Sequence, residues 1–369
     1  MSARRRFGSL RKQRNGRWQA RYKGPDGRER QGPTTFATKT DAARWLDGVA
    51  SDMQRGSWSD PKDQAVTLGS YAADWLKQRR LAPRTAELYG DLLRLHLVPQ
   101  LGGMPIGKIT PADVRRWHSG RLDSTGKTRT RQSYALLRTV LGTAVRDGLL
   151  PSNPCAIVGA GQNTNPERPY LSRKQAELLA DAMPADMRAL VITTLWAHLR
   201  LGELLAVRRE DVDLAAGTMH IHRAISRTRT GPIETTTKTK RGRTVHLPSQ
   251  ALEALRRHLE LTGPALPSAR LFTHSSGRPL EAHHIRVAWT RARGAVGLEQ
   301  YHWHDLRHAG LTYVAQQGAS LKEIMARGGH STPAAAMIYQ HAAEARDAAI
   351  ATMLSDEPTD SRKQGLSTQ

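Results

Sequence analysis

The sequence HDLRH at residues 304–308 decides how the rest of the chain is interpreted, and two further segments follow it: GGH, which ends at His330, and YQH, which begins at Tyr339. On a helix, His304 and Arg307 stand three residues apart and share one face. Tyr339 follows His330 by nine residues. The pattern brings imidazoles, a guanidinium and a phenol into one short part of the sequence.

Two earlier segments carry further charged groups. In AHLRLGELLAV, which begins at Ala197, Arg200 and Glu203 also stand three residues apart, so that on a helix the carboxylate can orient the guanidinium. TKTKRGRTVHLP, which begins at Thr237, contains Lys238 and Lys240 and predicts a basic turn between two short strands.

These segments together resemble the tyrosine recombinase family of the phage-integrase type. The family pattern is an Arg in a Gly-Leu-Arg-x-Gly-Glu box, a Lys in a β-turn, His-x-x-Arg, Leu-Gly-His, and a Tyr nine residues after that last His. The chain has all six positions in this order: Arg200, Lys238, His304, Arg307, His330 and Tyr339. Lys238 is preferred because the family usually has Lys-Thr there, and Lys240 is the alternative. The chain departs from the pattern at His198, where the family has Gly, and in the Gly-Gly-His element, which lacks the Leu.

The resemblance implies that the Tyr339 hydroxyl attacks a DNA phosphodiester, giving a 3′-phosphotyrosine and a free 5′-hydroxyl. A tyrosine hydroxyl has a reference pKa of ~10, so it needs a proton acceptor or a strongly positive field. Arg200 and Arg307 would bind the phosphate oxygens, because a guanidinium keeps its charge and offers a planar fork of donors.

The remaining positions are assigned to proton transfer and phosphate contact by the same resemblance. His304 would accept the tyrosine proton or assist its transfer, and His330 would donate to the phosphate. Lys238 would protonate the leaving 5′-oxygen, which requires a removable proton. The phosphotyrosine conserves the energy of the broken bond, so we expect no cofactor, neither metal nor ATP.

The fifteen histidines raise the alternative of a metal site. His304 and His308 have the spacing of two zinc ligands on one helix, and His220 and His222 share a strand face. There is no His-Glu-x-x-His arrangement, and the single cysteine, Cys155, offers no thiolate cluster. The sequence therefore predicts no metal, and His308 is interpreted as a packing or backbone-bonding residue.

Charge and composition indicate the kind of partner. The chain has 369 residues, with 56 Lys and Arg against 33 Asp and Glu and a net charge of +23. A surplus of this size indicates a polyanion, most simply nucleic acid. With 38% hydrophobic residues the chain can form ordinary cores, which excludes wholesale disorder. The apolar stretches are too short to span a bilayer, there is no secretory signal, and one cysteine fits a reducing compartment, so we expect a cytoplasmic protein without membrane contact. The resemblance implies a bacterial host and association with the nucleoid.

The expected fold is multidomain and mainly α with α+β parts. Residues 1–57 predict a small three-stranded sheet plus one helix, because two hairpin turns separate alternating runs and the first thirty residues hold eleven basic side chains against two acidic ones. Residues 64–157 predict a helical bundle, and residues 170–355 a mixed α/β catalytic domain. Residues 356–369 form a polar tail that we expect to be disordered. The first two parts resemble the arm-binding and core-binding domains of phage integrases.

The predicted DNA-binding residues lie in three basic segments, for which a solvated charged surface is the alternative. They are Arg4, Arg5, Arg6, Arg11, Lys12, Arg17 and Arg21 in the N-terminal part, Lys127, Arg129 and Arg131 in the helical part, and Lys240, Arg241 and Arg243 near the predicted lysine turn.

The resemblance implies a site-specific DNA recombinase, the integrase of a phage or integrated mobile element. Four protomers would exchange strands in pairs through a Holliday junction, and the apolar strip from Ala342 to Leu354 would dock in trans on a neighbouring protomer. A host DNA-bending protein and an excision accessory factor are expected partners. The alternatives are a non-catalytic DNA-binding protein, which the intact set of reacting groups disfavours, and a type IB-like topoisomerase, which the N-terminal domain and the docking segment disfavour.

Overall fold

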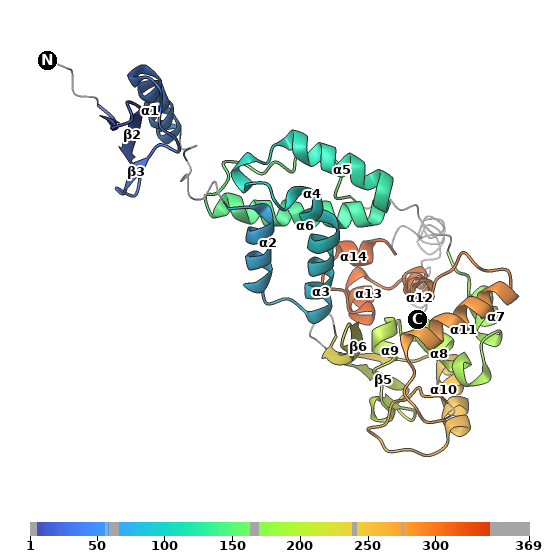
Figure 1. The fold of residues 1–369 in the computed structure, drawn as a ribbon. Helices are drawn as coiled ribbons and strands as arrows, with labels where there is room; N and C mark the ends of the chain where they lie inside the picture. The colour runs from blue at the N-terminus through green and yellow to red at the C-terminus, as the bar shows by residue number, and fades with distance from the viewer. Residues whose placement is uncertain are drawn as a thin grey trace, which may run out of the picture. The chain divides into compact units, whose positions relative to one another are not determined.

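The computed structural model describes residues 6–55, 58, 66–162, 170–237, 242–274 and 276–339. The chain divides into two compact units, 1–165 and 166–369, and the fold is rich in helix with small sheets, as expected (Figure 1). The predicted polar tail and the predicted docking segment lie outside the described residues. Within these ranges no helix is both long and apolar enough to cross a membrane.

The N-terminal part confirms the predicted sheet and helix. Three antiparallel strands pair in the order β1 (Ser9–Lys12), β2 (Trp18–Lys23) and β3 (Glu29–Gln31), and α1 (Lys39–Gln54) packs against β2. Thr38 caps α1, because its side chain accepts a hydrogen bond from the backbone N–H of Asp41. The alternation along β2 buries Ala20 and Tyr22 and leaves Arg21 between them partly exposed.

The helical part forms a bundle with its own core, which contains Trp75, Tyr134, Leu137 and Leu141. Its helices are α2 (Leu68–Lys77), α3 (Pro83–Leu92), α4 (Val98–Leu101), α5 (Pro111–Thr125) and α6 (Lys127–Arg146), with a π-helical turn at Leu93–Leu97. A capping box between Thr110 and Asp113 starts α5. The last helix begins directly after Gly126.

The second unit combines helices with two small sheets. Its helices are α7 (Arg173–Asp181), α8 (Arg188–Trp196), α9 (Leu201–Leu204), α10 (Ser249–Thr262), α11 (Ala282–Ala295), α12 (Trp303–Gln316), α13 (Leu321–Gly328) and α14 (Ala334–Met337). Its strands are β4 (Val212–Asp213), β5 (Thr218–Ile221), β6 (Arg223–Thr228), β7 (Gly231–Thr236) and β8 (Arg243–His246). One sheet has the order β4-β5-β8, and β6 pairs with β7 in a separate hairpin.

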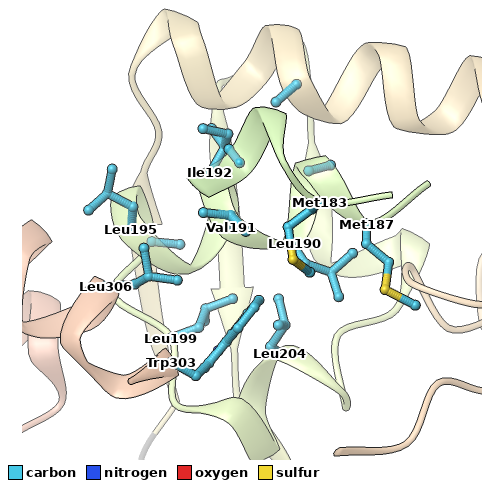
Figure 2. Packing of buried hydrophobic residues seen from close by; sticks show 14 of the residues in the cluster. Met183, Met187, Leu190, Val191, Ile192, Leu195, Leu199, Leu204, Trp303 and Leu306 are labelled. Atoms are coloured by element: carbon cyan, nitrogen blue, oxygen red, sulfur yellow. The ribbon is translucent and has the colours of Figure 1, made fainter. Parts of the chain in front are cut away.

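The core of this unit is organised around α8. Every residue from Ala189 to Leu195 is buried, which is typical of a helix covered on all sides. Figure 2 shows the side chains of α8 beside Leu204 of α9 and beside Trp303 and Leu306 of α12. The core thereby fixes the elements on which the sequence predicts Arg200, His304 and Arg307.

Close contact between α8 and α12 depends on Gly310. A Cβ at this position would lie 1.9 Å from the carbonyl oxygen of Leu195, so only glycine allows the two helices to approach this closely. The approach brings the N-terminal half of α12, with Arg307, beside the residues that follow α8.

Candidate active site

Three arginines meet at the C-terminal end of α13. The carbonyl of Arg327 accepts a hydrogen bond from Arg243 at 3.0 Å. The next carbonyl, of Gly328, accepts from Arg307, and that of Gly329 accepts from Arg200 at 3.2 Å. The carbonyls at the end of a helix have no partner within it and carry a partial negative charge, so cations are favourable there. Gly329 ends α13 in a left-handed conformation, with φ of 59°. The helix end therefore fixes three guanidiniums in one cluster, next to His330.

Glu203 links two of these arginines. Its carboxylate accepts from Arg200 Nη1 at 2.8 Å and from Arg243 Nη2 at 2.8 Å, and it also accepts from the Arg200 backbone N–H at the start of α9. Burial alone would raise the pKa of this carboxyl, but the hydrogen bonds and charges of Arg243 and Arg200 lower it to about 2. The predicted pairing of Arg200 with Glu203 thus forms with an ionised carboxylate, and Arg200 stands at the N-cap rather than inside the helix.

Arg307 is the most deeply buried of the three, with 1% of its surface exposed. It donates to the carbonyls of His198 and Gly328 and to Nε2 of His330, at 2.9 Å in the last case. Across the described ranges no carboxylate lies within ion-pair distance of this guanidinium. Burial, and then the charge of Arg200, lower the pKa of Arg307 to about 10, so it remains charged at neutral pH. A buried charge without an ion-pair partner is costly, and an anionic ligand would relieve that cost.

His198, the departure from the family's Gly, keeps the backbone that a glycine would adopt. Its φ is 53°, in the left-handed region, which costs a non-glycine residue about 1 kcal/mol. The conformation directs its carbonyl to Arg307, while its buried Nε2 lies 3.2 Å from the Nε of Arg327. Burial and the surrounding arginines hold the pKa of His198 well below its usual value, so the ring is neutral and accepts this hydrogen bond.

Tyr339 lies in the same cluster, with 3% of its surface exposed. Its ring stacks on that of His330, with centroids 5.8 Å apart and an angle of 5° between the planes. Its hydroxyl oxygen is 2.9 Å from Nδ1 of His308. Burial raises the pKa of the phenol, and the charges of Arg307 and Arg200 counteract this increase. The phenol and the guanidinium pair therefore meet within one chain.

The two predicted histidines differ in their surroundings. Nε2 of His330 accepts from Arg307, so its Nδ1 carries the proton, and this buried N–H has no hydrogen-bond partner in the part of the chain that is described. His304 is more exposed and packs edge-on against His308, with ring centroids 4.7 Å apart. Removal of water by the surrounding protein and nearby positive groups lower the pKa of both rings, each to about 4.

Several predicted residues lie outside the described residues: Lys238, Lys240, Arg241, Arg4 and Arg5. In the sequence the lysine segment lies between β7 and β8, which belong to different sheets, and the predicted lysine turn falls outside the described residues.

The other predicted DNA-binding residues divide by exposure. Those at the surface are Arg6, Arg11, Lys12, Arg17, Lys127 and Arg129, and those partly exposed are Arg21 and Arg131. Arg243 differs, because its side chain is only 9% exposed and its nitrogens bond to Glu203 and to backbone carbonyls. Its place on β8 explains this, since Thr244 and His246 face outward and Arg243 faces inward.

Three residues of the site were not assigned to it from the sequence. Arg243 was interpreted as a DNA contact and His308 as a packing residue, and Arg327 was not singled out. The spacing of His308 from His304 was the available signal, but it does not show which ring meets Tyr339. Considering only the described ranges, no group of three or more His, Cys, Asp or Glu side chains is arranged to hold a metal ion.

Comparison with known proteins identifies the family of the chain. Residues 169–346 match the phage integrase family, residues 6–55 the phage integrase N-terminal domain, and residues 67–121 the phage integrase N-terminal SAM-like domain. The chain belongs to the phage integrase family of site-specific tyrosine recombinases.

Among curated relatives, the putative prophage phiRv2 integrase of Mycobacterium tuberculosis is 38% identical over 361 residues, covering 95% of this chain and 96% of that protein. Two solved structures share the fold. The Tn1549 transposon integrase in complex with a circular intermediate DNA has a TM-score of 0.69 at 18% identity, covering 78% of this chain and 99% of that chain. The lambda integrase tetramer bound to a Holliday junction has a TM-score of 0.57 at 19% identity, covering 92% of this chain and 96% of that chain.

Proposed function

We propose that this recombinase integrates and excises a phage genome or another mobile element by cleaving and rejoining DNA at attachment sites through a 3′-phosphotyrosine intermediate. The observation that carries the proposal is the position of the buried Tyr339 hydroxyl, in the field of Arg200 and Arg307. Arg307 has no carboxylate at ion-pair distance in the described chain, which leaves its charge for a phosphate.

In the cleavage step, the Tyr339 oxygen bonds to phosphorus and the bond to the 5′-oxygen breaks. Negative charge accumulates on the non-bridging oxygens, and Arg200 and Arg307 stabilise it as preorganised donors. The Nδ1–H of His330, which has no partner among the described residues, supplies a further donor. Lys238, with Lys240 as the alternative, protonates the leaving oxygen. Because the phosphotyrosine retains the bond energy, religation needs no ATP.

Strand exchange requires more than one protomer. Four protomers pair their cleavage events through a Holliday junction, and the segment after Tyr339 docks in trans to link neighbouring active sites. The lambda integrase tetramer, which has the same fold and is bound to a Holliday junction, supports this assembly. Sedimentation of the DNA complex formed by a chain truncated after His341 tests it, because tetramers that form unchanged would contradict trans docking.

The N-terminal sheet is assigned to a second class of DNA site. Its match to the phage integrase N-terminal domain and its exposed Arg6, Arg11 and Lys12 support binding to arm sites apart from the core site. A host DNA-bending protein and an excision factor, which the resemblance to phage integrases implies, are proposed partners.

The experiment for this function is a suicide substrate made from DNA of the element's own ends and nicked beside the cleavage site. The wild-type protein should form a covalent adduct, and Tyr339→Phe should form none. Absence of an adduct with the wild type would contradict the proposal. Exchange between two cognate sites distinguishes an integrase from a topoisomerase, which would relax supercoils without site preference.

The catalytic lysine is identified with a second substrate. A 5′-bridging sulfur in place of oxygen gives a leaving group that needs no proton. We expect Lys238→Ala to cleave the oxygen substrate poorly and the sulfur substrate normally, with Lys240→Ala as the matched control. The reverse result would assign the role to Lys240.

A further inference from the structure

We infer that His308 accepts the proton of Tyr339 when the hydroxyl attacks phosphorus, and returns it at religation. The inference rests on the proposed function, and it assigns a catalytic role to a residue that the sequence pattern does not include.

The first argument is geometric. Nδ1 of His308 is 2.9 Å from the hydroxyl oxygen, within the hydrogen-bond distance that a general base requires. His330 cannot take this role at Nε2, because that nitrogen already accepts from Arg307. His304 contacts the ring of His308, and in the described chain its own nitrogens make no hydrogen bond to the phenol. Of the three rings, His308 is the one joined to the reacting atom.

The second argument concerns how His308 is held. It follows Arg307 directly on α12, so the helix fixes the proton acceptor relative to the phosphate-binding guanidinium. Its backbone carbonyl accepts from Thr312 Oγ1 at 2.9 Å, and its ring lies against that of Tyr339 with centroids 5.7 Å apart. The acceptor is therefore preorganised and needs no rearrangement of the helix to reach the hydroxyl.

The third argument is chemical. Burial makes the phenol harder to ionise, so attack needs an acceptor in contact. As the O–P bond forms, the phenol O–H bond breaks and its proton moves to Nδ1 of His308. The bond to the 5′-oxygen breaks at the same phosphorus, and that oxygen takes a proton from the lysine. Religation reverses both transfers, so protons and electron pairs balance.

Charged and titratable groups face His308 from two parts of the chain. His304 and Arg307 lie on its own helix, His330 and Tyr339 face it from the C-terminal segment, and Arg200 lies beyond. A bound phosphodiester would add negative charge beside the guanidiniums, close to the imidazolium that the proton transfer forms.

The test compares His308→Asn with the matched variant His304→Asn in single-turnover cleavage of the suicide substrate between about pH 5.5 and 9. We expect His308→Asn to slow adduct formation by about 10²-fold or more and to lose the acidic limb of the pH profile. His304→Asn should keep that limb. The sulfur substrate, which bypasses the lysine, should not rescue His308→Asn.

Chemical rescue separates catalysis from folding. Imidazole added to His308→Gly should restore cleavage in proportion to its concentration, while DNA affinity stays at the wild-type level. Cleavage by His308→Asn within about 3-fold of wild type with an unchanged pH profile, or failure of imidazole to rescue His308→Gly, would overturn the inference. In both cases an adduct with wild type leaves the proposed function intact, whereas no wild-type adduct would overturn that function itself.

Discussion

The basic residues of the catalytic unit and those of the N-terminal sheet carry the same charge in opposite surroundings. Arg307 is 1% exposed and bonds to two carbonyls and a histidine, whereas the side chain of Arg28, just before β3, is 85% exposed. Arg11 and Lys12 on β1 are exposed as well. Net charge therefore indicates a polyanionic partner, while burial distinguishes a preorganised phosphate site from a diffuse electrostatic surface.

The difference has an energetic consequence. Charges at the surface act through water and are screened by salt over about 10 Å at 0.1 M. Charges in the buried cluster interact more strongly and are screened less. Substitutions in the active site should therefore affect stability and chemistry, and substitutions in the sheet should affect the salt dependence of binding.

The largest effect is expected from Glu203→Gln. This change removes the buried carboxylate between Arg200 and Arg243, so the free energy of unfolding should fall by about 3–5 kcal/mol. Urea denaturation measures it. The control is Glu253→Gln, which breaks an exposed pair with Arg257 on α10 and should cost less than about 1 kcal/mol. Equal stability of the two variants would contradict the distinction.

The next effect is expected from Arg307→Lys, which keeps the charge and removes the planar fork. A lysine cannot reproduce the hydrogen bonds to His198, Gly328 and His330, and the rate of cleavage should fall by about 10²–10³-fold. Single-turnover kinetics on the suicide substrate measure this rate. Arg11→Lys in the exposed sheet is the matched control and should cleave at the wild-type rate. A similar result for both would mean that charge alone is sufficient in the site.

The sequence predicted those parts of the molecule that local patterns determine. The turns at Asn15-Gly16 and Gly24–Gly27, the alternation along β2 and the apolar run of α8 all depend on near neighbours, and these elements are present. The run from Met219 to Ile225 alternates as one strand would, but it contributes to two different sheets. The strand β7 was not predicted, because GPIETT has no apolar alternation and pairs through its backbone with β6.

The candidate site was predicted as a set of residues but not as an arrangement. Motif spacing identifies Arg200 and Arg307 as site residues, but it does not show that both bond to the end of α13. Arg200 is more than a hundred residues away from that helix end in the sequence. The sequence does not distinguish Arg243 from an exposed arginine. The structure does, because Arg243 occupies a position of β8 that faces inward. The contact of His308 with Tyr339 depends in the same way on tertiary packing.

A moderate effect is expected from the double substitution Arg11→Gln and Lys12→Gln in the sheet. For each phosphate that the variant no longer neutralises, the slope of log affinity against log salt should become shallower by about 0.9 for duplex DNA. Titration of arm-site DNA at several salt concentrations measures this slope. Arg256→Gln with Arg257→Gln on α10 is the control, exposed in the other unit. An unchanged slope in the sheet variant would contradict the proposal that Arg11 and Lys12 of β1 neutralise DNA phosphates.

The smallest effect is expected on the free energy of unfolding when the pH is lowered. The pKa of His330 is lowered to about 4 by burial and by Arg307, whereas an unfolded histidine has a pKa of ~6.5. Below ~6.5 the unfolded chain binds more protons than the folded chain, so the free energy of unfolding should decrease as the pH falls from about 6.5 to about 4. Glu203, with a pKa of about 2, loses its charge only at lower pH, so its contribution falls outside this range. Urea denaturation at several pH values measures the slope, and His330→Gln should make it shallower, while His304 and His198, whose pKa values are also lowered, keep their contributions. A free energy of unfolding that rises with acid in this range would contradict a neutral, hydrogen-bonded His330 beside Arg307.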